Sequence, residues 1–234
     1  YITCEWAKSE VDRKAVGTIP LSYASTCCLV LLILTVLAFG VGVDLDKEQL
    51  LWGKEQNVKD DPATAERVKL ICKNVLELDE TGKDTGKSDI ICAYNFSICY
   101  LFSRKDLVKY FSICRGTLKQ EGLFFCDIFG GETAIKPDIR RRDLSNGVKY
   151  EFEQIDFCPI THHSHFRMSF KFPDGSKLKE AFTYDWRVWT LPEIRDAMMD
   201  AGFSKTVVWF LDESEDVPEG TYEPMEETYQ REAW

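Results

Sequence analysis

Residues 89–131 decide the fold, and they read DIICAYNFSICYLFSRKDLVKYFSICRGTLKQEGLFFCDIFGG. The segment opens with a short apolar stretch at 89–94 and closes with another at 123–129. Between them, residues 104–119 carry apolar side chains at helical spacing, and we expect Gly122 to end that helix. A strand, a helix and a second strand, with both strands almost continuously apolar, predict a parallel sheet covered on both faces. The chain is therefore expected to have an α/β fold.

The sequence before this segment extends the same pattern. The stretch VGVDLD at 41–46 has the composition of a short buried strand that ends in two carboxylates. Asp46 is placed to cap a helix over 47–57, and residues 68–72 form a further strand. The predicted sheet thus continues on the N-terminal side of the deciding segment.

The sequence after the deciding segment changes character. Residues 149–184 alternate polar and apolar side chains, and PDGS at 173–176 is typical of a tight hairpin turn, so a small antiparallel sheet is expected here. An amphipathic helix at 190–203 and a final strand at 205–211 follow.

The charge of the chain is concentrated at its end. The net charge is −10, and between Asp212 and Glu232 there are nine acidic residues and one basic residue. We expect the tail over 212–234 to be loosely ordered. An acidic chain with a nearly neutral body is unsuited to binding phosphate backbones, which argues against nucleic-acid partners.

The cysteines indicate the compartment. The chain holds nine, an odd number, with no CxxC pair, and most lie inside apolar runs. Such residues behave as small buried hydrophobes, and the pattern favours a reducing, cytoplasmic location over a secreted disulfide framework.

One long apolar run raises a membrane question. Residues 27–43 form 17 consecutive positions that are apolar, Gly or Thr, which is just long enough for a spanning helix. A signal peptide fits less well, because a polar segment precedes the run and no small-residue cleavage site follows it. A membrane anchor formed by residues 19–43 is the alternative to a cytoplasmic location.

Polar side chains follow two of the predicted strands. Asp44 is a carboxylate at a strand end, where doubly wound folds hold ribose hydroxyls; the alternative is that this acidic pair serves only to cap the next helix through Asp46. Asn95, Phe96 and Ser97 follow the strand at 89–94, either as a ligand-binding edge or as a simple loop cap.

All three histidines lie in THHSHF at 161–166. In a strand, His163 and His165 would share one face and His162 the other. A metal site needs three or four converging ligands, so no metal site is predicted here.

Several segments occur together in a recognisable order: AVG at 15–17, GVDLDKEQLLWGKEQN at 42–57, DIICAYNFSICYLFSRKDLVKYF at 89–111, GLFFCDIFGG at 122–131, and the stretch from FKFPDGS to DAGF at 170–203. Together they resemble a class I S-adenosylmethionine-dependent methyltransferase of the small-molecule type found in bacteria and plants. The resemblance implies a Rossmann-like, mostly parallel sheet of seven strands that ends in an antiparallel strand. It also implies an antiparallel insert after the fifth strand, at 149–184, within a domain over 1–211.

The resemblance implies S-adenosyl-L-methionine as cofactor and a small molecule as methyl acceptor. Asp44, with Asp46 beside it, matches the acid that binds ribose, and Asn74 and Val75 match the position that lines adenine. The segment Asn95, Phe96 and Ser97 matches the one that faces the cofactor and the acceptor. No catalytic base is assigned with certainty; the candidates are Asp127, His163, His165 and Tyr184.

Two departures from the family lead to further expectations. The family has a Gly-containing cofactor loop after its first strand, whereas this chain starts inside the helix that follows, so we expect an N-terminally truncated form with impaired cofactor binding. The family also runs directly from AVG into VDLD, whereas residues 18–42 intervene here and would split the second strand. We expect this insert to be a retained intron or a gene-model error. The rival hypotheses are a non-catalytic binding module with the same fold, and a single-pass membrane protein with a soluble α/β domain.

Overall fold

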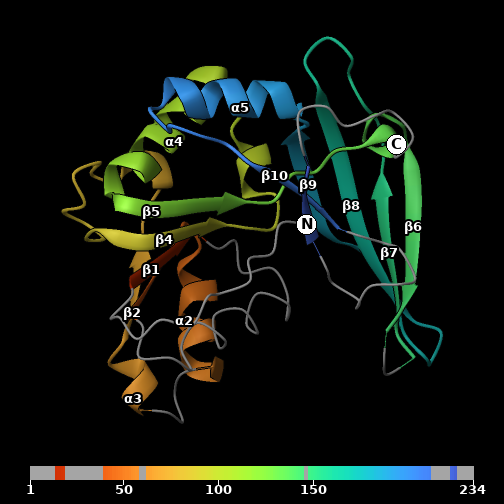
Figure 1. Cartoon of the computed structure of the whole chain (residues 1–234). Coiled ribbons are helices and arrows are strands. Elements are labelled where there is room, and N and C mark those ends of the chain that lie inside the picture. The colour runs from red at the N-terminus through yellow and green to blue at the C-terminus, as the bar shows by residue number, and fades with distance from the viewer. Residues whose placement is uncertain (1–13, 19–38, 58–61, 145–146, 212–221, 226–234) are drawn as a thin grey trace. The chain divides into compact units, whose positions relative to one another are not determined.

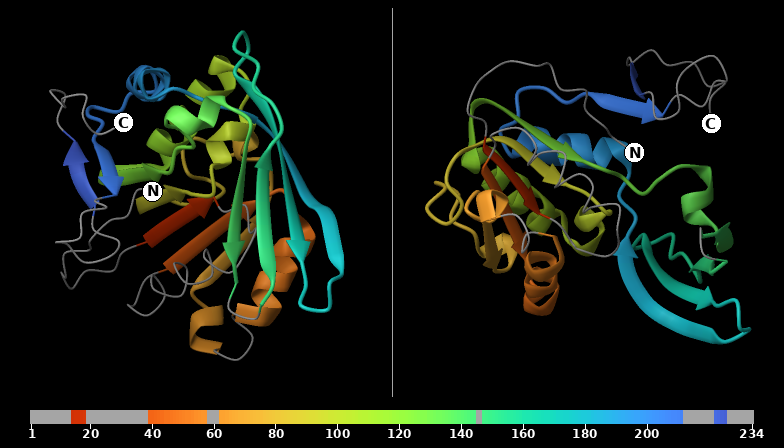
Figure 2. Two further views of the ribbon diagram at one scale, coloured as in Figure 1. Left: turned by 90° about the vertical axis from the view of Figure 1, so that its right-hand side faces the viewer. Right: turned by 90° about the horizontal axis from the view of Figure 1, so that it is seen from below.

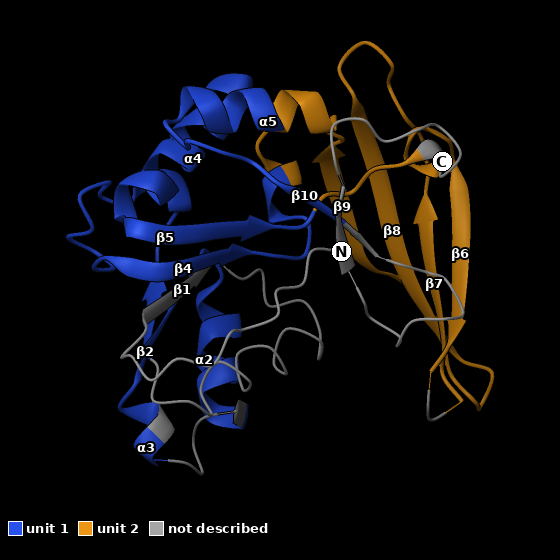
Figure 3. Ribbon diagram, viewed as in Figure 1, with its two compact units in different colours: residues 1–98, 103–127, 195–229 blue, residues 99–102, 128–194, 230–234 orange. Residues whose placement is uncertain are grey.

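The computed structural model describes residues 14–18, 39–57, 62–144, 147–211 and 222–225. The chain forms two compact units (Figure 3). Unit 1 comprises residues 1–98, 103–127 and 195–229, and unit 2 comprises residues 99–102, 128–194 and 230–234.

Unit 1 is built on a five-stranded parallel sheet with the order β3-β2-β1-β4-β5. Its strands are β1 (Lys14–Thr18), β2 (Phe39–Asp44), β3 (Val68–Cys72), β4 (Ser88–Ala93) and β5 (Leu118–Cys126). The chain moves outward from β1 through β2 to β3, and then in the opposite direction through β4 to β5. This reversal next to the central strand is the mark of a doubly wound α/β fold, as the sequence predicted.

Helices cover both faces of this sheet. The described helical elements of unit 1 include α2 (Lys47–Asn57), α3 (Pro62–Ala65), the short η1 (Val75–Glu77) and α4 (Arg104–Thr117). Because crossovers between parallel strands are right-handed, the helices on either side of β1 cover opposite faces. Accordingly, α2 packs on β3 and α4 packs on β5 (Figure 1). The core between the layers includes Val43 of β2, Ile91 of β4 and Phe111 of α4, each at most 2% exposed.

The expectation that residues 18–42 split a single strand is wrong. Residues 15–17 belong to β1 and residues 41–44 to β2, and these are two neighbouring parallel strands, with Ala15 opposite Gly40 and Thr18 opposite Val43. The β1 strand also pairs with β4, which makes it the central strand of the sheet, so the expectation that the family's first strand precedes residue 1 is wrong as well. Parallel neighbours need a connection of a dozen residues or more, so about 20 residues is an ordinary length between β1 and β2.

The apolar run divides between described and undescribed residues. Its last part, Phe39–Val43, lies in β2. Residues 19–38 lie outside the described residues, and the proposed membrane helix over 19–43 falls mostly on them. Within the described parts of the chain, no helix is both long enough and apolar enough to cross a membrane.

The predicted end of the central helix is also corrected. α4 ends at Thr117, and β5 begins at the next residue, so Gly122 lies inside the strand and does not terminate the helix. The pairing of β4 with β5 shifts register between Ser88 and Ile90. A Cβ on Gly122 would lie 3.0 Å from the Ser88 carbonyl oxygen. Glycine suits this position because the two backbones approach closely at this irregularity.

Unit 2 is dominated by a four-stranded antiparallel sheet with the order β6-β7-β8-β9 (Figure 2). The strands are β6 (Asp138–Asp143), β7 (Lys149–Gln154), β8 (His163–Lys171) and β9 (Lys177–Arg187), and the unit also contains the short η3 (Glu132–Ile135). The predicted hairpin turn joins β8 and β9, with Gly175 at φ 86° and the Phe172 N–H donating to the Ser176 carbonyl at 2.9 Å. The β6 strand was not predicted, because all six of its residues are exposed and it therefore lacks an apolar alternation.

The two faces of this sheet differ in chemistry. One face, called here the aromatic face, carries Tyr150, Phe152, Phe166, Phe170, Phe182, Tyr184 and Trp186. Their rings pack closely: the centroids of Phe166 and Trp186 are 4.7 Å apart, and Phe152 stacks on Phe166 at 5.4 Å. The opposite face carries ion pairs between neighbouring strands, such as Arg141–Glu151 at 2.8 Å.

The C-terminal elements complete the chain. α5 (Leu191–Asp200) begins as predicted with a capping box, in which Thr190 and Glu193 bond each other's backbone N–H groups and the Thr190 hydroxyl bonds the Glu193 carboxylate. β10 (Val208–Leu211) pairs with β11 (Tyr222–Met225) in a separate two-stranded antiparallel sheet, so it does not extend the parallel sheet. The expectation of a loosely ordered tail is therefore wrong for residues 222–225, which pair with β10; the other residues of the tail over 212–234 lie outside the described residues.

Candidate functional site

The carboxyl ends of the parallel strands in unit 1 bring several predicted residues to one edge. Because the strands run in the same direction, the residues that follow β2, β3, β4 and β5 emerge at the same edge of the sheet. Asp44, Asn74, Asn95 and Asp127 stand at these four strand ends. Open α/β sheets bind ligands at this edge, next to the reversal of strand order.

The acidic pair after β2 has two separate roles. Asp44 is half-buried and its Oδ1 accepts the Asp46 N–H at 2.8 Å, which fixes the turn out of the strand. Asp46 is exposed, and its Oδ1 accepts the N–H groups of Glu48 at 2.9 Å and Gln49 at 3.2 Å. Asp46 is therefore the N-cap of α2, which leaves Asp44 as the carboxylate of the strand end.

The residues after β3 are also held by a cap. The Asn74 Oδ1 accepts the Leu76 N–H at 2.9 Å, so Asn74 is the N-cap of η1, and Val75 is the first residue of that short helix. Both side chains are half-buried. The structure thus fixes the backbone of Asn74 and Val75 at the sheet edge.

The loop after β4 has an unusual backbone. Asn95 and Phe96 both have left-handed conformations, with φ of 59° and 55°. This conformation costs a residue with a side chain about 1–2 kcal/mol, so two in succession must be held by other contacts. The Asp127 carboxylate provides them: its Oδ2 accepts the Asn95 N–H at 2.9 Å and its Oδ1 accepts the Phe96 N–H at 2.8 Å.

Asp127 is buried, with 5% of its surface exposed. Burial raises the pKa of its carboxyl, and the N–H groups of Phe96 and Asn95 act in the opposite direction. Because both oxygens bond the loop backbone, the geometry gives Asp127 a positioning role. From the sequence, Asp127 is only a candidate base. The single local signal for a positioning role is its place directly after a strand, because the residues that it bonds, Phe96 and Asn95, lie 31 and 32 residues away.

Ser97 completes the loop. Its Oγ is buried, and it has no hydrogen-bond partner among the residues that the structure describes. A buried hydroxyl without a partner costs about 1–3 kcal/mol, so this atom marks a point at which a ligand would gain a hydrogen bond.

The other three candidate bases lie in unit 2, and the structure does not bring them together there. His163 and His165 stand in β8 opposite Arg187 and Asp185, on the charged face of the sheet. Tyr184 stands on the aromatic face, with its ring 5.0 Å from that of Trp186. His162 precedes β8 with φ 59°, and its Nδ1 lies 3.3 Å from the Val188 carbonyl oxygen.

His165 is oriented by a carboxylate, that of Asp156. The ring Nδ1 of His165 lies 2.9 Å from Asp156 Oδ2, and the backbone N–H of His165 donates to Asp156 Oδ1 at 2.9 Å. The hydrogen bond with Asp156 raises the pKa of the imidazole. The backbone hydrogen bond from His165, followed by the bond from its ring, lowers the pKa of Asp156. The arrangement holds a basic imidazole in a fixed orientation at an exposed position.

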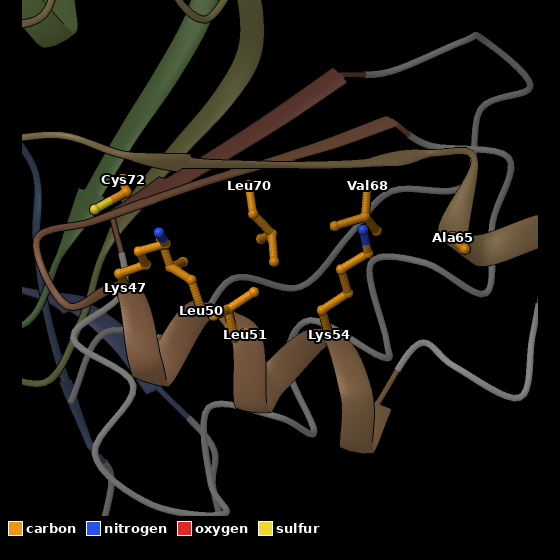
Figure 4. Close-up of a pocket in the computed structure, with 8 residues that line it drawn as sticks. All are labelled: Lys47, Leu50, Leu51, Lys54, Ala65, Val68, Leu70 and Cys72. Carbon is orange, nitrogen blue, oxygen red and sulfur yellow. The ribbon is translucent and has the colours of Figure 1, made fainter.

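A pocket of about 230 Å³ lies in unit 1 between α2 and β3 (Figure 4). Leu50 and Leu51 of α2 and Leu70 of β3 supply apolar walls, and Lys47 and Lys54 lie along the helix. None of the predicted cofactor residues lines it. It lies along the flank of the sheet, so it is not the site at the carboxyl edge.

Comparisons with known proteins give a fold. No protein-family model matches the chain, and no curated protein sequence matches it.

Solved structures do match. A S-adenosylmethionine-dependent methyltransferase from Clostridium acetobutylicum is 19% identical with a TM-score of 0.60, covering 82% of this chain and 73% of that one. The CcbJ methyltransferase from Streptomyces caelestis is 12% identical with a TM-score of 0.66, covering 85% and 73%. CalS10 from Micromonospora echinaspora, an amino pentose methyltransferase solved with S-adenosylmethionine bound, is 10% identical with a TM-score of 0.60, covering 90% and 82%. Together with the strand order, these matches show that the chain has the fold of the class I S-adenosylmethionine-dependent methyltransferases.

Proposed function

We propose that the chain binds S-adenosylmethionine at the carboxyl edge of the unit 1 sheet and transfers its methyl group to a small-molecule acceptor. One observation carries this proposal: Asp44 ends the strand next to the central strand of a doubly wound sheet. A carboxylate there is an acceptor-only group, which suits it to two neighbouring ribose hydroxyls.

The other residues of this edge fit the same ligand. Asn74 and Val75 would line the adenine ring, because their backbone is fixed at the end of β3. Asn95, Phe96 and Ser97 would face the reacting part of the cofactor, and the buried Ser97 Oγ supplies a polar atom that has no described protein partner.

The cofactor supplies an activated methyl group on a sulfonium, so the protein's task is to position the acceptor in line and to exclude water. Asp127 serves this task by holding the loop after β4 in its left-handed conformation. A base is needed only if the acceptor atom carries a proton that must leave. The candidates His163, His165 and Tyr184 lie in unit 2, and we assign that role to none of them.

We further propose that cofactor affinity is reduced in this chain. The connection that follows the central strand β1 in a dinucleotide-type fold approaches the ligand closely and uses glycine for that approach. Residues 19–38, which follow β1, contain no glycine. We also propose a reducing compartment, because most of the nine cysteines lie inside apolar runs and none belongs to a CxxC pair.

Calorimetric titration with S-adenosylhomocysteine tests the cofactor site. We expect Asp44→Asn to weaken binding by about tenfold or more, because it replaces an acceptor with a donor that faces the ribose hydroxyls. Asp46→Asn is the matched control, since Asn is an equally good N-cap and the residue lies two positions away. Equal affinities for all three proteins would overturn the assignment of Asp44.

The rival hypotheses have separate readouts. A chain that binds S-adenosylhomocysteine, yet forms none from S-adenosylmethionine in the presence of a panel of small amines and hydroxyl compounds, would favour a non-catalytic module. A full-length protein that requires detergent to remain in solution would favour the membrane-anchored form.

A further inference from the structure

The loop after β4 continues directly into residues that belong to unit 2. Residues 95–97 lie in unit 1, whereas residues 99–102, called here the linking segment, belong to unit 2. The short helical element η2 (Ser97–Tyr100) runs without a break from the loop into the linking segment. Because this connection is a single turn of helix, contacts that fix the linking segment also restrict the end of the loop.

Two side chains at the end of β9 hold the backbone of the linking segment. The Trp189 Nε1 donates to the Leu101 carbonyl oxygen at 3.0 Å, and the Arg187 Nη1 donates to the Phe102 carbonyl oxygen at 2.8 Å. Neither carbonyl group lies in a helix or a strand, so the two side chains provide hydrogen bonds that regular structure would otherwise supply. Trp189 is 2% exposed and Leu101 is 9% exposed, which places their bond in the interior of unit 2.

The guanidinium group of Arg187 is itself oriented by two further contacts. Its Nη2 donates to Glu193 Oε1 at 3.1 Å, and its central carbon lies 3.6 Å from the centroid of the Trp189 ring. Arginine is suited to this arrangement because its planar group bonds in fixed directions and stacks on an aromatic ring at the same time. The donor that faces the Phe102 carbonyl is therefore held in place before any ligand binds.

We propose that Arg187 and Trp189 are positioning residues for the loop after β4, and that they act through the linking segment. Asp127 holds the beginning of the loop, and the two residues at the end of β9 fix the segment into which the loop continues. The expected effect on cofactor binding rests on the proposed function, because it assigns this loop to the cofactor. The expected effect on the loop itself requires no cofactor.

Hydrogen exchange, followed by NMR on the full chain without ligand, tests the effect on the loop. We expect Arg187→Gln to raise the exchange rates of the Asn95 and Phe96 amides, called here the loop amides, by about tenfold. The reason is that removal of the guanidinium donors makes local opening of the loop more frequent. The amides of β7 and β8 should exchange at unchanged rates, whereas a general loss of stability in unit 2 would accelerate them as well.

A second variant guards against a nonspecific effect of the first. Trp189→Phe removes the Nε1 donor to Leu101 but keeps an aromatic ring beside the Arg187 guanidinium group. We expect it to raise the exchange rates of the loop amides in the same direction as Arg187→Gln.

Arg167→Gln is the matched control. Arg167 also lies in unit 2 and forms two ion pairs, but its partners, Glu153 and Glu180, belong to β7 and β9 and not to the linking segment. It should leave the exchange of the loop amides unchanged. The proposal is overturned if neither Arg187→Gln nor Trp189→Phe accelerates the loop amides, or if Arg167→Gln accelerates them equally.

Titration with S-adenosylhomocysteine on the same proteins separates this proposal from the proposed function. We expect Arg187→Gln to weaken binding by about threefold to tenfold under conditions in which the variant remains folded, and Arg167→Gln to leave it unchanged. If the unaltered chain does not bind, the proposed function fails, while faster exchange of the loop amides would still support the positioning role. If the unaltered chain binds and the exchange rates do not change, the proposed function stands and the positioning role is wrong.

Discussion

The loop after β4 allows one prediction to be worked out from the structure. Asp127→Ala removes both acceptors of the Asn95 and Phe96 N–H groups. Hydrogen bonds to a charged group contribute about 1.5–3 kcal/mol each, so the gross loss is roughly 3–6 kcal/mol. Two effects offset part of it: a buried carboxylate no longer has to be desolvated, and the loop can relax from its left-handed conformation, which recovers about 1–2 kcal/mol per residue. We expect a net loss of about 1–3 kcal/mol in the free energy of unfolding.

Asp127→Asn provides the internal comparison. The amide retains one acceptor oxygen but places an NH₂ group against the second N–H, so roughly half of the hydrogen bonding survives and the expected loss is about 0.5–2 kcal/mol. Urea unfolding followed by tryptophan fluorescence measures both free energies, and titration with S-adenosylhomocysteine measures the consequence for the site. The affinity for S-adenosylhomocysteine should fall even under conditions in which the variant remains folded, because the loop then samples other conformations. If Asp127→Ala unfolds at the same urea concentration as the unaltered chain, the positioning role is refuted.

Three further predictions concern packing, thiol reactivity and pH. Gly116→Ala should lower the free energy of unfolding by about 1–3 kcal/mol, because the added Cβ would clash with the Glu80 carbonyl oxygen. Helix propensity alone predicts a gain of about 1 kcal/mol, so urea unfolding decides the sign. Cys158 should react with iodoacetamide in the native protein, because hydrogen bonds from its turn lower the pKa of its thiol. Cys114 should react only after unfolding, because burial raises its pKa to about 12, and mass spectrometry of labelled peptides distinguishes the two. The His165 imidazole should titrate above its ordinary pKa, and Asp156→Asn should lower its NMR midpoint, since the carboxylate stabilises the protonated ring; an unchanged midpoint would contradict the pairing.

Local sequence patterns predicted the elements whose signals lie within a few residues. The helices α2 and α5 begin where Asp46 and Thr190 provide caps, because a cap and its partner N–H groups are at most three residues apart. The same holds for the hairpin between β8 and β9, where Gly175 and its neighbours determine the turn.

The features that were missed depend on distant partners. Residues 14–18 form a strand only because β2 and β4 flank them, and their composition alone does not reveal this. The exposed β6 is a strand because β7 offers it a hydrogen-bonding edge. The link from Asp127 to Asn95 joins two strand ends, and no local periodicity reports such a contact. Whether Asp44, Asn74 and Ser97 hold the cofactor stays a prediction that the titrations above will decide.

The two sheets also differ in how far apart in the sequence their paired strands lie. Each strand of the sheet in unit 2 pairs with its neighbour in sequence, so the four strands over residues 138–187 can assemble as soon as that segment has left the ribosome. The central strand of the parallel sheet is synthesised earlier but pairs with a distant segment, since Ala15 lies opposite Ile90. Local pairings of this kind form faster than distant ones, since less chain entropy is lost before the first contacts are made. The meander is therefore expected to form its strand pairings faster than the parallel sheet does, because each pairing closes only a short stretch of chain.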